Sequence, residues 1–339
     1  MKLAVFAYSR RGCALARRVM DALPEAEGTC CTLPRFEEPG FLPIPQPSLP
    51  FYGELFREMD ALIFIGAAGI ALRSVAPHVR SKKTDPAVLC LDERGSWVIP
   101  LLSGHIGGAN ALARTLAEAL GAQCVITTAT DVNHRFSVDT WATENGYLLS
   151  SMAAAKAVSA EILERDVPFL SELPVLTPLA PGLIPGETGS VGIYIGWEKK
   201  EPFGVTLRLI PRVLHLGVGC RRGTPEETIR DAVEGVLTSA GIDPAAIRCA
   251  ASIDLKKDEA GLLAYCERRG WPLAFYSAEE LKALPGNFTP SEFVTKITGV
   301  DNVCERSALM GAERLILHKT AVNGVTVALA AEKTEVRFG

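Results

Sequence analysis

The stretch with the strongest chemical signal is Ser103-Gly104-His105-Ile106-Gly107-Gly108-Ala109-Asn110, between an apolar run and an amphipathic segment that ends near Leu120. Its glycines remove side chains where the chain leaves a predicted strand, so a ligand can approach the backbone and left-handed conformations are tolerated. Free N–H groups at the start of the following helix favour an anion. His105 lies in the middle and can titrate near neutral pH. The pattern predicts a site that holds a carboxylate or a developing oxyanion beside a proton carrier.

An ordinary tight turn with a satisfied histidine is the alternative interpretation of this octapeptide. Three glycines, a histidine, a serine and an asparagine exceed what a turn needs, so we favour a ligand role. The spacing is not the G-x-G-x-x-G fingerprint of dinucleotide-binding loops, and the lysine of a P-loop is missing. Nucleotide binding is therefore a weaker hypothesis than binding of another anion.

A second glycine-rich loop runs from Gly217 to Thr224 and contains Arg221 and Arg222. Arginine binds carboxylates with two parallel hydrogen bonds, so this loop could also hold an anion. A capped turn with solvated arginines explains the same residues equally well. In that interpretation Thr224 and Glu227 form a capping box at the start of a helix. Cys220 could have a lowered pKa at this helix start, although a buried structural thiol is the favoured alternative.

Further charged residues lie near predicted strand or loop ends. The basic ones are Arg73, Lys82, Lys83, Lys256 and Lys257. Each alone is expected on a solvated surface, but together with two glycine-rich loops they predict a ligand with several negative groups.

Two carboxylates, Asp131 and Glu305, are candidates for acid–base chemistry or hydrogen bonding, and capping or surface roles explain them at least as well. The five histidines show no H-x-x-x-H spacing and the cysteines no C-x-x-C spacing, so no zinc site is predicted.

Length and composition exclude several classes of protein. A chain of 339 residues has room for two or three domains, and a net charge of -4 argues against general nucleic-acid binding. No apolar stretch reaches the roughly 20 residues of a membrane span. Nine scattered cysteines without a secretory segment predict reduced thiols in a cytoplasmic protein.

The order of predicted elements indicates an α/β protein with a largely parallel N-terminal sheet, because apolar strands alternate with helices. Its predicted segments include a strand at Ala61–Gly66, a hairpin turn at Glu93-Arg94-Gly95 and a strand at Gln123–Ala129. Six prolines between Pro34 and Pro50 predict an irregular surface loop.

Ligands of parallel sheets bind at the carboxyl ends of the strands. We therefore expect four loops to share one edge of the sheet: Ser9–Gly12, Gly66–Gly69, Ser103–Asn110 and Thr128–His134.

Three regions follow from these patterns: an N-terminal α/β domain at 1–146, a small middle or linker unit at 147–210, and a C-terminal α/β domain at 211–339. The middle region is rich in proline, and an apparent strand pair follows it at Val191–Trp197 and Gly204–Ile210. In the last region Ser277 is a predicted helix cap, and Asn323-Gly324 between apolar residues predicts a hairpin.

Several blocks in this order resemble one family: LLSGHIGGAN, ITTATD, GVGCRRGT, ASIDLKKDEAGL, FYSAEEL, GNFTPSEFV, TGVDNVCERSAL and NGVTVALA. They resemble the cobalt-precorrin 5A hydrolase (CbiG) family of anaerobic cobalamin biosynthesis. The likeness runs from about Gly66 to Asp131 and from Leu214 to Ala330. The block from about Pro211 is also similar to the small cobalamin-pathway protein CobE, which implies a substrate-holding domain.

The resemblance implies an enzyme that hydrolyses a lactone of a contracted cobalt-tetrapyrrole and releases acetaldehyde, giving cobalt-precorrin 5B. Such a substrate carries acetate and propionate groups, in agreement with the predicted polyanion. Cobalt would arrive inside the substrate, so no further cofactor is expected. The resemblance also implies transient contact with neighbouring pathway enzymes. A non-catalytic carrier of corrinoid intermediates is the alternative, and a nucleotide-dependent transferase is a weaker third.

Lactone opening needs an activated water and donors for an oxyanion. We hypothesise that His105 is the base, that Asp131 orients it, and that Ser103 or the Gly107 and Gly108 amides are oxyanion donors. The predicted substrate-binding residues are Gly66, Arg73, Lys82, Lys83, Gly104, Gly107, Gly108, Asn110, Gly219, Arg221, Lys256, Lys257, Asn287 and Glu305.

Overall fold

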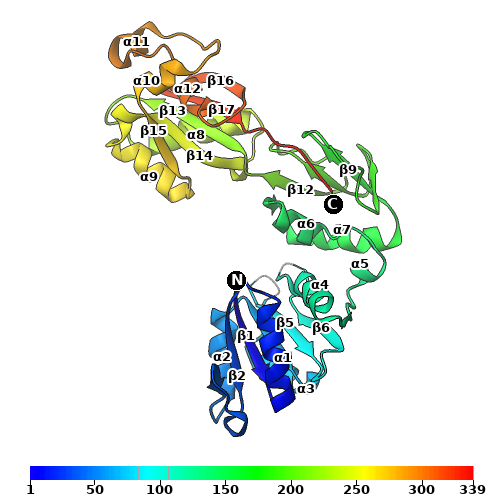
Figure 1. Cartoon of the computed structure of the whole chain (residues 1–339). Coiled ribbons are helices and arrows are strands. Elements are labelled where there is room, and N and C mark those ends of the chain that lie inside the picture. The colour runs from blue at the N-terminus through cyan, green and yellow to red at the C-terminus, as the bar shows by residue number, and fades with distance from the viewer. Residues whose placement is uncertain (82–83, 106, 339) are drawn as a thin grey trace. The chain divides into compact units, whose positions relative to one another are not determined.

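The computed structural model describes residues 1–81, 84–105 and 107–338 (Figure 1). The predicted contacts Lys82 and Lys83 lie outside these residues. The chain forms two compact units, Met1–Trp141 and Ala142–Gly339. The first contains one sheet and the second contains two. Strands and helices alternate through much of the chain, which confirms the predicted α/β class.

The sheet of the first unit has seven strands in the order β3-β2-β1-β4-β5-β6-β7. All neighbours pair in parallel except β5 and β6, so the prediction of a mostly parallel sheet is confirmed. The strands are β1 (Lys2–Ala7), β2 (Glu27–Thr32), β3 (Phe41–Pro43), β4 (Ala61–Ile65), β5 (Ala87–Leu91), β6 (Trp97–Leu102) and β7 (Gln123–Cys124).

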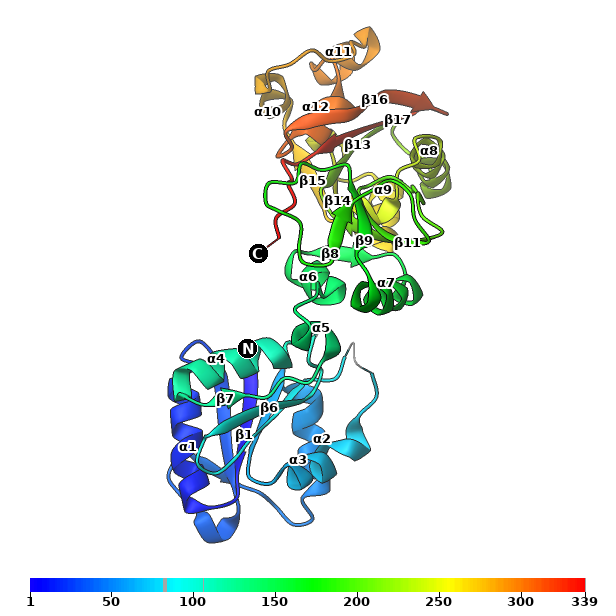
Figure 2. The same ribbon diagram turned by 90° about the vertical axis from the view of Figure 1, so that its right-hand side faces the viewer.

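Helices cover both faces of this sheet, which is why the central strands β4 and β5 are apolar and buried at every position. Alternate residues of β1 belong to two different cores: Leu3, Val5 and Ala7 lie in one, and Ala4 and Phe6 in the other. Helices α1 (Arg10–Asp21) and α4 (Ala109–Leu120) pack on the first core. Helices α2 (Leu49–Glu58) and α3 (Ala68–Val75) pack on the second (Figure 2).

The antiparallel pairing of β6 with β5 separates the four loops that were expected at one edge. The carboxyl ends of β1 and β4 lie beside the β5–β6 turn, where the Ser9 hydroxyl donates to Glu93 at 2.8 Å. The carboxyl ends of β6 and β7 lie at the opposite edge, next to the start of β5. The expectation of one shared edge is therefore wrong, because the predicted hairpin reverses the chain direction.

Two local predictions in this unit are also wrong. The proline-rich segment 34–50 contains a 3-10 turn at Pro34–Phe36 and the edge strand β3, and α2 begins within it. Edge strands tolerate proline, which explains how β3 forms there. The predicted strand Gln123–Ala129 stops at Cys124, and a short helix, α5 (Ala129–Val132), follows.

The first sheet of the second unit has the order β10-β9-β11-β12-β8. The predicted strand pair at 191–210 forms its parallel strands β11 and β12, and helix α7 packs on β9, β11 and β12. These elements are β8 (Tyr147–Leu149), α7 (Met152–Glu164), β9 (Val167–Ser171), β10 (Leu183–Pro185), β11 (Val191–Ile195) and β12 (Val205–Pro211).

The other sheet of this unit has the order β15-β14-β13-β17-β16. Ser277 forms the expected helix cap, and Asn323-Gly324 forms the expected hairpin turn. The strands are β13 (Leu214–Cys220), β14 (Ile247–Ile253), β15 (Leu273–Tyr276), β16 (Arg314–Val322) and β17 (Val325–Ala331). The helices are α8 (Glu226–Ser239), α9 (Ala260–Arg269), α10 (Ala278–Ala283), α11 (Glu292–Thr298) and α12 (Val303–Leu309).

A buried histidine in the sheet β15-β14-β13-β17-β16 contacts two segments that are distant from it in the chain. His215 in β13 is 7% exposed, and its two ring nitrogens contact the Met310 carbonyl at 3.0 Å and Glu332 at 2.9 Å. The hydrogen bond with Cys249 and the contacts with Glu332 and Met310 raise the pKa of His215 to about 9, although burial lowers it. The imidazolium form therefore stabilises this unit.

Replacing His215 with Gln should lower the free energy of unfolding by roughly 1–3 kcal/mol at pH 6. The folded pKa lies above the unfolded value of 6.5, so this stabilisation is complete below pH 6.5 and is lost as pH rises through about 9. Urea unfolding of both proteins at pH 6 and pH 10 measures the effect. If His215→Gln loses the same free energy of unfolding at pH 6 and pH 10, the positive charge of His215 does not contribute to stability.

Candidate functional site

His105 lies in the loop that connects β6 with α4, and this loop folds tightly on itself. A Cβ added at Gly107 would lie 2.3 Å from the Ser103 Cβ, and one added at Gly104 would lie 2.8 Å from the Asn110 side-chain oxygen. Gly108 has φ 78°, a conformation that favours glycine. Two of these glycines therefore permit close approach of the loop to itself, and the third permits the turn into α4.

The main-chain N–H groups at the start of α4 bond to the same loop. Gly108 donates to the His105 carbonyl at 2.8 Å, Ala109 to the Ser103 carbonyl at 3.1 Å and Asn110 to the Gly104 carbonyl at 2.9 Å. The Ser103 hydroxyl donates to the main-chain oxygen of Asp85 at 2.9 Å. The prediction that the Gly108 amide and Ser103 are free oxyanion donors is therefore wrong, because both groups already have acceptors.

The His105 ring lies between two carboxylates. Its Nε2 is 3.1 Å from Asp131 Oδ2 and 3.3 Å from the Thr130 hydroxyl, and its Nδ1 is 3.6 Å from Asp139 Oδ1. The side chains of His105, Asp131 and Asp139 are 24%, 16% and 11% exposed. Asp139 lies in helix α6 (Val138–Glu144) and Asp131 in α5. The site is half-buried, so its electrostatic interactions are stronger than in bulk water.

Asp131 accepts hydrogen bonds from several side chains. Thr128 donates at 2.7 Å and Asn110 at 3.0 Å to Oδ2, which His105 also contacts, and Arg114 donates to Oδ1. Burial raises the pKa of Asp131, but the hydrogen bonds from Thr128, Arg114 and His105 lower it to about 2. Asp131 is therefore ionised at neutral pH and favours the tautomer with the proton on Nε2, which leaves the lone pair on Nδ1.

Sequence reasoning predicted His105, Asp131 and Asn110 as site residues and placed Thr128 only within a candidate loop. It missed Asp139 and Arg114 in this cluster. Arg114 had a usable signal, because it lies four residues after Asn110 and hence on the same face of α4. Asp139 had none, since its approach to His105 depends on how the segment after β7 folds back. Asn110, predicted to bind substrate, donates to Thr128 and Asp131.

The two other predicted residues of the first unit lie apart from this cluster. Gly66 follows β4 at the opposite edge of the sheet, where its N–H donates to the Leu91 carbonyl. Arg73 is exposed on α3. The structure therefore does not bring Gly66 to His105, because β6 runs against β4 and β5.

In the second unit, two predicted loops meet at the carboxyl ends of β13 and β14. Glu259 joins them: its carboxylate accepts from the Gly223 N–H at 2.6 Å and from Lys256 at 3.2 Å. The Arg221 and Lys257 side chains are exposed. Gly219 allows a close approach, since a Cβ there would lie 2.5 Å from the Thr326 hydroxyl. The predicted basic cluster thus forms, with Lys256 already paired.

Two details of this region differ from the prediction. Thr224 forms no capping box: its hydroxyl donates to the Arg221 carbonyl, and α8 begins after Pro225 without a side-chain cap. Burial raises the pKa of the Cys220 thiol, which contradicts the hypothesis of a lowered pKa.

Glu305 holds protein segments together. It is 0% exposed and accepts from the Thr289 N–H at 2.7 Å, the Thr289 hydroxyl at 2.8 Å and the Lys319 N–H at 2.7 Å. His318 Nδ1 lies 3.3 Å away. The prediction that Glu305 contacts substrate is wrong for this conformation, because these groups enclose its carboxylate. Asn287 is exposed and lies two residues before Thr289.

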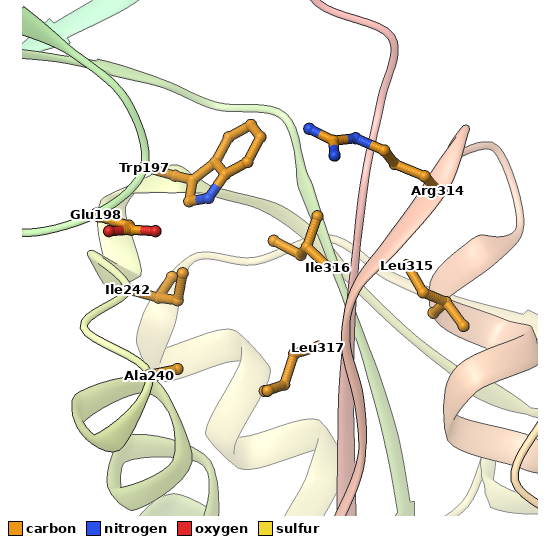
Figure 3. A pocket seen from close by; sticks show the side chains of 8 residues that line it. All are labelled: Trp197, Glu198, Ala240, Ile242, Arg314, Leu315, Ile316 and Leu317. Carbon is orange, nitrogen blue, oxygen red and sulfur yellow. The ribbon is translucent and has the colours of Figure 1, made fainter. Parts of the chain in front are cut away.

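The second unit also contains a cavity of about 350 Å³ between Trp197 and β16 (Figure 3). The Arg314 guanidinium points toward the Trp197 ring, 5.9 Å from its centroid, and Ile242 and Leu317 line the interior. None of the predicted site residues that the structure describes lines this cavity.

Among the residues that the structure describes, no group of three or more His, Cys, Asp or Glu side chains is arranged to hold a metal ion. In the same part of the chain, no helix combines the length and apolar character needed to cross a membrane.

Replacing Asp131 with Asn should lower the free energy of unfolding of the first unit by roughly 1–3 kcal/mol at pH 7, because the charge that pairs with Arg114 and His105 is lost. The folded pKa of about 2 lies below the usual 3.8, so this stabilisation is present above pH 3.8 and is lost as pH falls toward 2. Denaturant unfolding from pH 7 to pH 3 measures it. If the difference in free energy of unfolding between wild type and Asp131→Asn does not become smaller below pH 4, the charge of Asp131 is not the source of the stabilisation.

Two family models match the chain. The model described as Cobalamin synthesis G N-terminal matches residues 51–131, and the one described as Cobalamin synthesis G C-terminus matches residues 214–330. A solved structure of a cobalamin biosynthesis protein G homolog from Sulfolobus solfataricus is 21% identical with a TM-score of 0.42, covering 97% of each chain.

Curated relatives cover most of the sequence. The chain is 35% identical to the cobalt-precorrin-5A hydrolase of Salmonella typhimurium, over 96% of this chain and 97% of that protein. It is 34% identical to the cobalt-precorrin-5A hydrolase of Priestia megaterium, over 81% and 79%. Protein CobE of Sinorhizobium sp. is 39% identical over 36% of this chain and 81% of its own length. The resemblance seen in the sequence is confirmed, and the chain belongs to the cobalt-precorrin-5A hydrolase (CbiG) family.

Proposed function

We propose that this protein is a cobalt-precorrin-5A hydrolase. It opens the ring-A acetate lactone of a contracted cobalt-tetrapyrrole and releases the extruded meso carbon as acetaldehyde, which gives cobalt-precorrin 5B. Family membership over nearly the whole chain supports this activity. The observation that carries the assignment of the site is the contact of His105 Nε2 with the ionised Asp131, at 3.1 Å.

The reaction needs two proton transfers. First, water attacks the lactone carbonyl while a base takes its proton, and the acyl C–O bond breaks to give a carboxylate and an alcohol. Next, a base takes the alcohol proton, the carbon–carbon bond to the extruded carbon breaks, and the macrocycle accepts the electron pair while acetaldehyde leaves. A single base that accepts and returns a proton can serve both steps.

His105 is suited to this role because its two nitrogens have different partners. Nε2–H donates to Asp131, whose pKa of about 2 keeps it charged, so Asp131 fixes the ring and stabilises the imidazolium that forms. Nδ1 carries the lone pair, and its distance of 3.6 Å from Asp139 Oδ1 exceeds a hydrogen bond.

We further propose that Asp139 positions the attacking water. One water molecule can contact Nδ1 and the Asp139 carboxylate together, and a polar pair at this distance is suited to such bridging. Among the predicted oxyanion donors, the Gly107 amide stays a proposal.

The test is turnover of cobalt-precorrin 5A by wild type and His105→Gln, with the released acetaldehyde trapped and quantified. Loss of the base should lower kcat by about 10²- to 10⁴-fold. His134→Gln is the matched control, because His134 is exposed and lies three residues after Asp131 in the sequence. Its kcat should equal that of wild type.

Two outcomes would contradict the proposal. If His105→Gln turns over at the wild-type rate, His105 is not the base, although the hydrolase activity would stand. If wild type binds the substrate and no aldehyde forms, the carrier alternative is correct.

We also propose that the protein needs no cofactor beyond the cobalt within its substrate. The donor groups of His105, Asn110 and Thr128 bond to the Asp131 carboxylate, an arrangement that suits acid–base chemistry. Action in the cytoplasm is proposed from the nine unpaired cysteines, together with transient contact with neighbouring enzymes of the pathway.

A further inference from the structure

A cavity of about 450 Å³ lies in the first unit, apart from the residues assigned above. It opens between α2 and residues 77–80 and 84–85, which follow α3 in the chain. Phe56 and Arg57 line it from α2, and His78, Arg80 and Asp85 line it from the other side. Pockets of this size bind small ligands or parts of larger ones.

The lining carries two guanidinium groups, those of Arg57 and Arg80. Arg57 Nε donates to the Gly53 carbonyl at 3.0 Å, which orients the side chain, while Arg80 bonds through its main-chain N–H. Within residues 1–81, 84–105 and 107–338, neither guanidinium pairs with a carboxylate. Both residues are exposed, so their guanidinium groups can reach an anion that enters the cavity from solvent.

Asp85 is the acidic residue among the described residues that line the cavity, and its carboxylate has a structural role. Asp85 is 7% exposed, and its Oδ2 accepts hydrogen bonds from the Arg80 and Ser81 main-chain N–H groups, both at 2.9 Å. These bonds fix the loop that carries Arg80 and offset part of the Asp85 charge. The cavity therefore remains favourable for a negative ligand.

A histidine is held at the same cavity by a specific packing contact. The His78 ring lies 6.2 Å from the Phe56 ring, and its Nε2 contacts the Leu49 carbonyl at 3.2 Å. A Cβ at Gly53 would lie 2.6 Å from the His78 ring, so the helix needs glycine there for the ring to fit. The apolar surface of Phe56 and Met59 completes a site with a charged and an apolar side.

The cavity is connected to the His105 loop. The Asp85 main-chain oxygen accepts the Ser103 hydroxyl, two residues before His105, and Val88 of β5 pairs with Leu102 at the end of β6. The cavity and the catalytic loop therefore share one edge of the sheet and one residue, Asp85.

We propose that this cavity binds a carboxylate-bearing side chain at the periphery of the tetrapyrrole, with Arg57 and Arg80 on the carboxylate and Phe56 against its methylene groups. This inference rests on the proposed function, because it takes the substrate from there. Guanidinium groups match carboxylates bidentately, and the connection through Asp85 places such a ligand at the same edge of the sheet as the His105 loop.

The first test is binding of uroporphyrin, a stable tetrapyrrole with acetate and propionate side chains, followed by fluorescence. Arg80→Gln should raise its Kd by about three- to tenfold, because one charge-assisted contact is lost. Arg57→Lys keeps the charge and loses the planar fork, so a smaller increase is expected. Arg11→Gln is the control: it removes an exposed arginine of the same unit, on the first turn of α1 at the opposite sheet edge, and should bind as wild type does.

A competition experiment separates carboxylate from phosphate. Tricarballylate should displace uroporphyrin from wild type more effectively than inorganic phosphate at the same ionic strength, and the preference should shrink in Arg80→Gln. Equal Kd values for wild type and Arg80→Gln, with unchanged thermal midpoints, would overturn the proposal. Stronger competition by phosphate would overturn the assignment to carboxylate.

Turnover of cobalt-precorrin 5A distinguishes this inference from the proposed function. Arg80→Gln should raise KM and leave kcat close to wild type, because it removes binding energy remote from the reacting bonds. If wild type releases acetaldehyde and Arg80→Gln has an unchanged KM, the carboxylate site is wrong and the hydrolase stands. If wild type binds uroporphyrin through Arg80 and releases no aldehyde, the proposed function is wrong and the site stands.

Discussion

The antiparallel pairing of β6 with β5 decides which residues can meet at the His105 loop. In a uniformly parallel sheet, the loops after β1, β4, β6 and β7 would lie together at the carboxyl edge. Because β6 reverses direction, the loops after β6 and β7 lie instead beside the start of β5. His105 therefore approaches Asp131 and Asp139 and lies at the same edge of the sheet as Asp85. Gly66 lies at the other edge.

At the edge of the sheet where His105 lies, the ionised carboxylate of Asp131 accepts hydrogen bonds from most of the polar side chains of the site. Asp131 accepts from Thr128, Asn110, Arg114 and His105, and these bonds outweigh the burial that would otherwise favour its neutral form. Its charge sets the tautomer of His105 and leaves Nδ1 toward Asp139. A neutral acceptor at this position would hold the ring with less electrostatic stabilisation of the imidazolium.

Several glycines and polar groups that the sequence predicted to bind a ligand instead hold the protein's own segments in contact. Gly104 and Gly107 let the loop contact itself, and the first amides of α4 donate to that loop. In the second unit, Glu305 is enclosed by hydrogen-bond donors. Buried polar groups need hydrogen-bond partners, and in both cases the protein supplies them. The groups bonded in this way are not left for a ligand.

The sequence alone determined the α/β class, the resemblance to the family and the hairpins at Glu93–Gly95 and Asn323-Gly324, and it led to the hypothesis that Asp131 orients His105. These depend on local apolar periodicity, on turn residues and on motif order, which a linear chain displays directly. Only the tertiary structure decided that Asp139 and Thr128 join His105, that Glu305 is buried, and that Arg57 and Arg80 line one cavity. These contacts join residues distant in the chain, and they depend on strand direction and on the packing of helices, which no local pattern encodes.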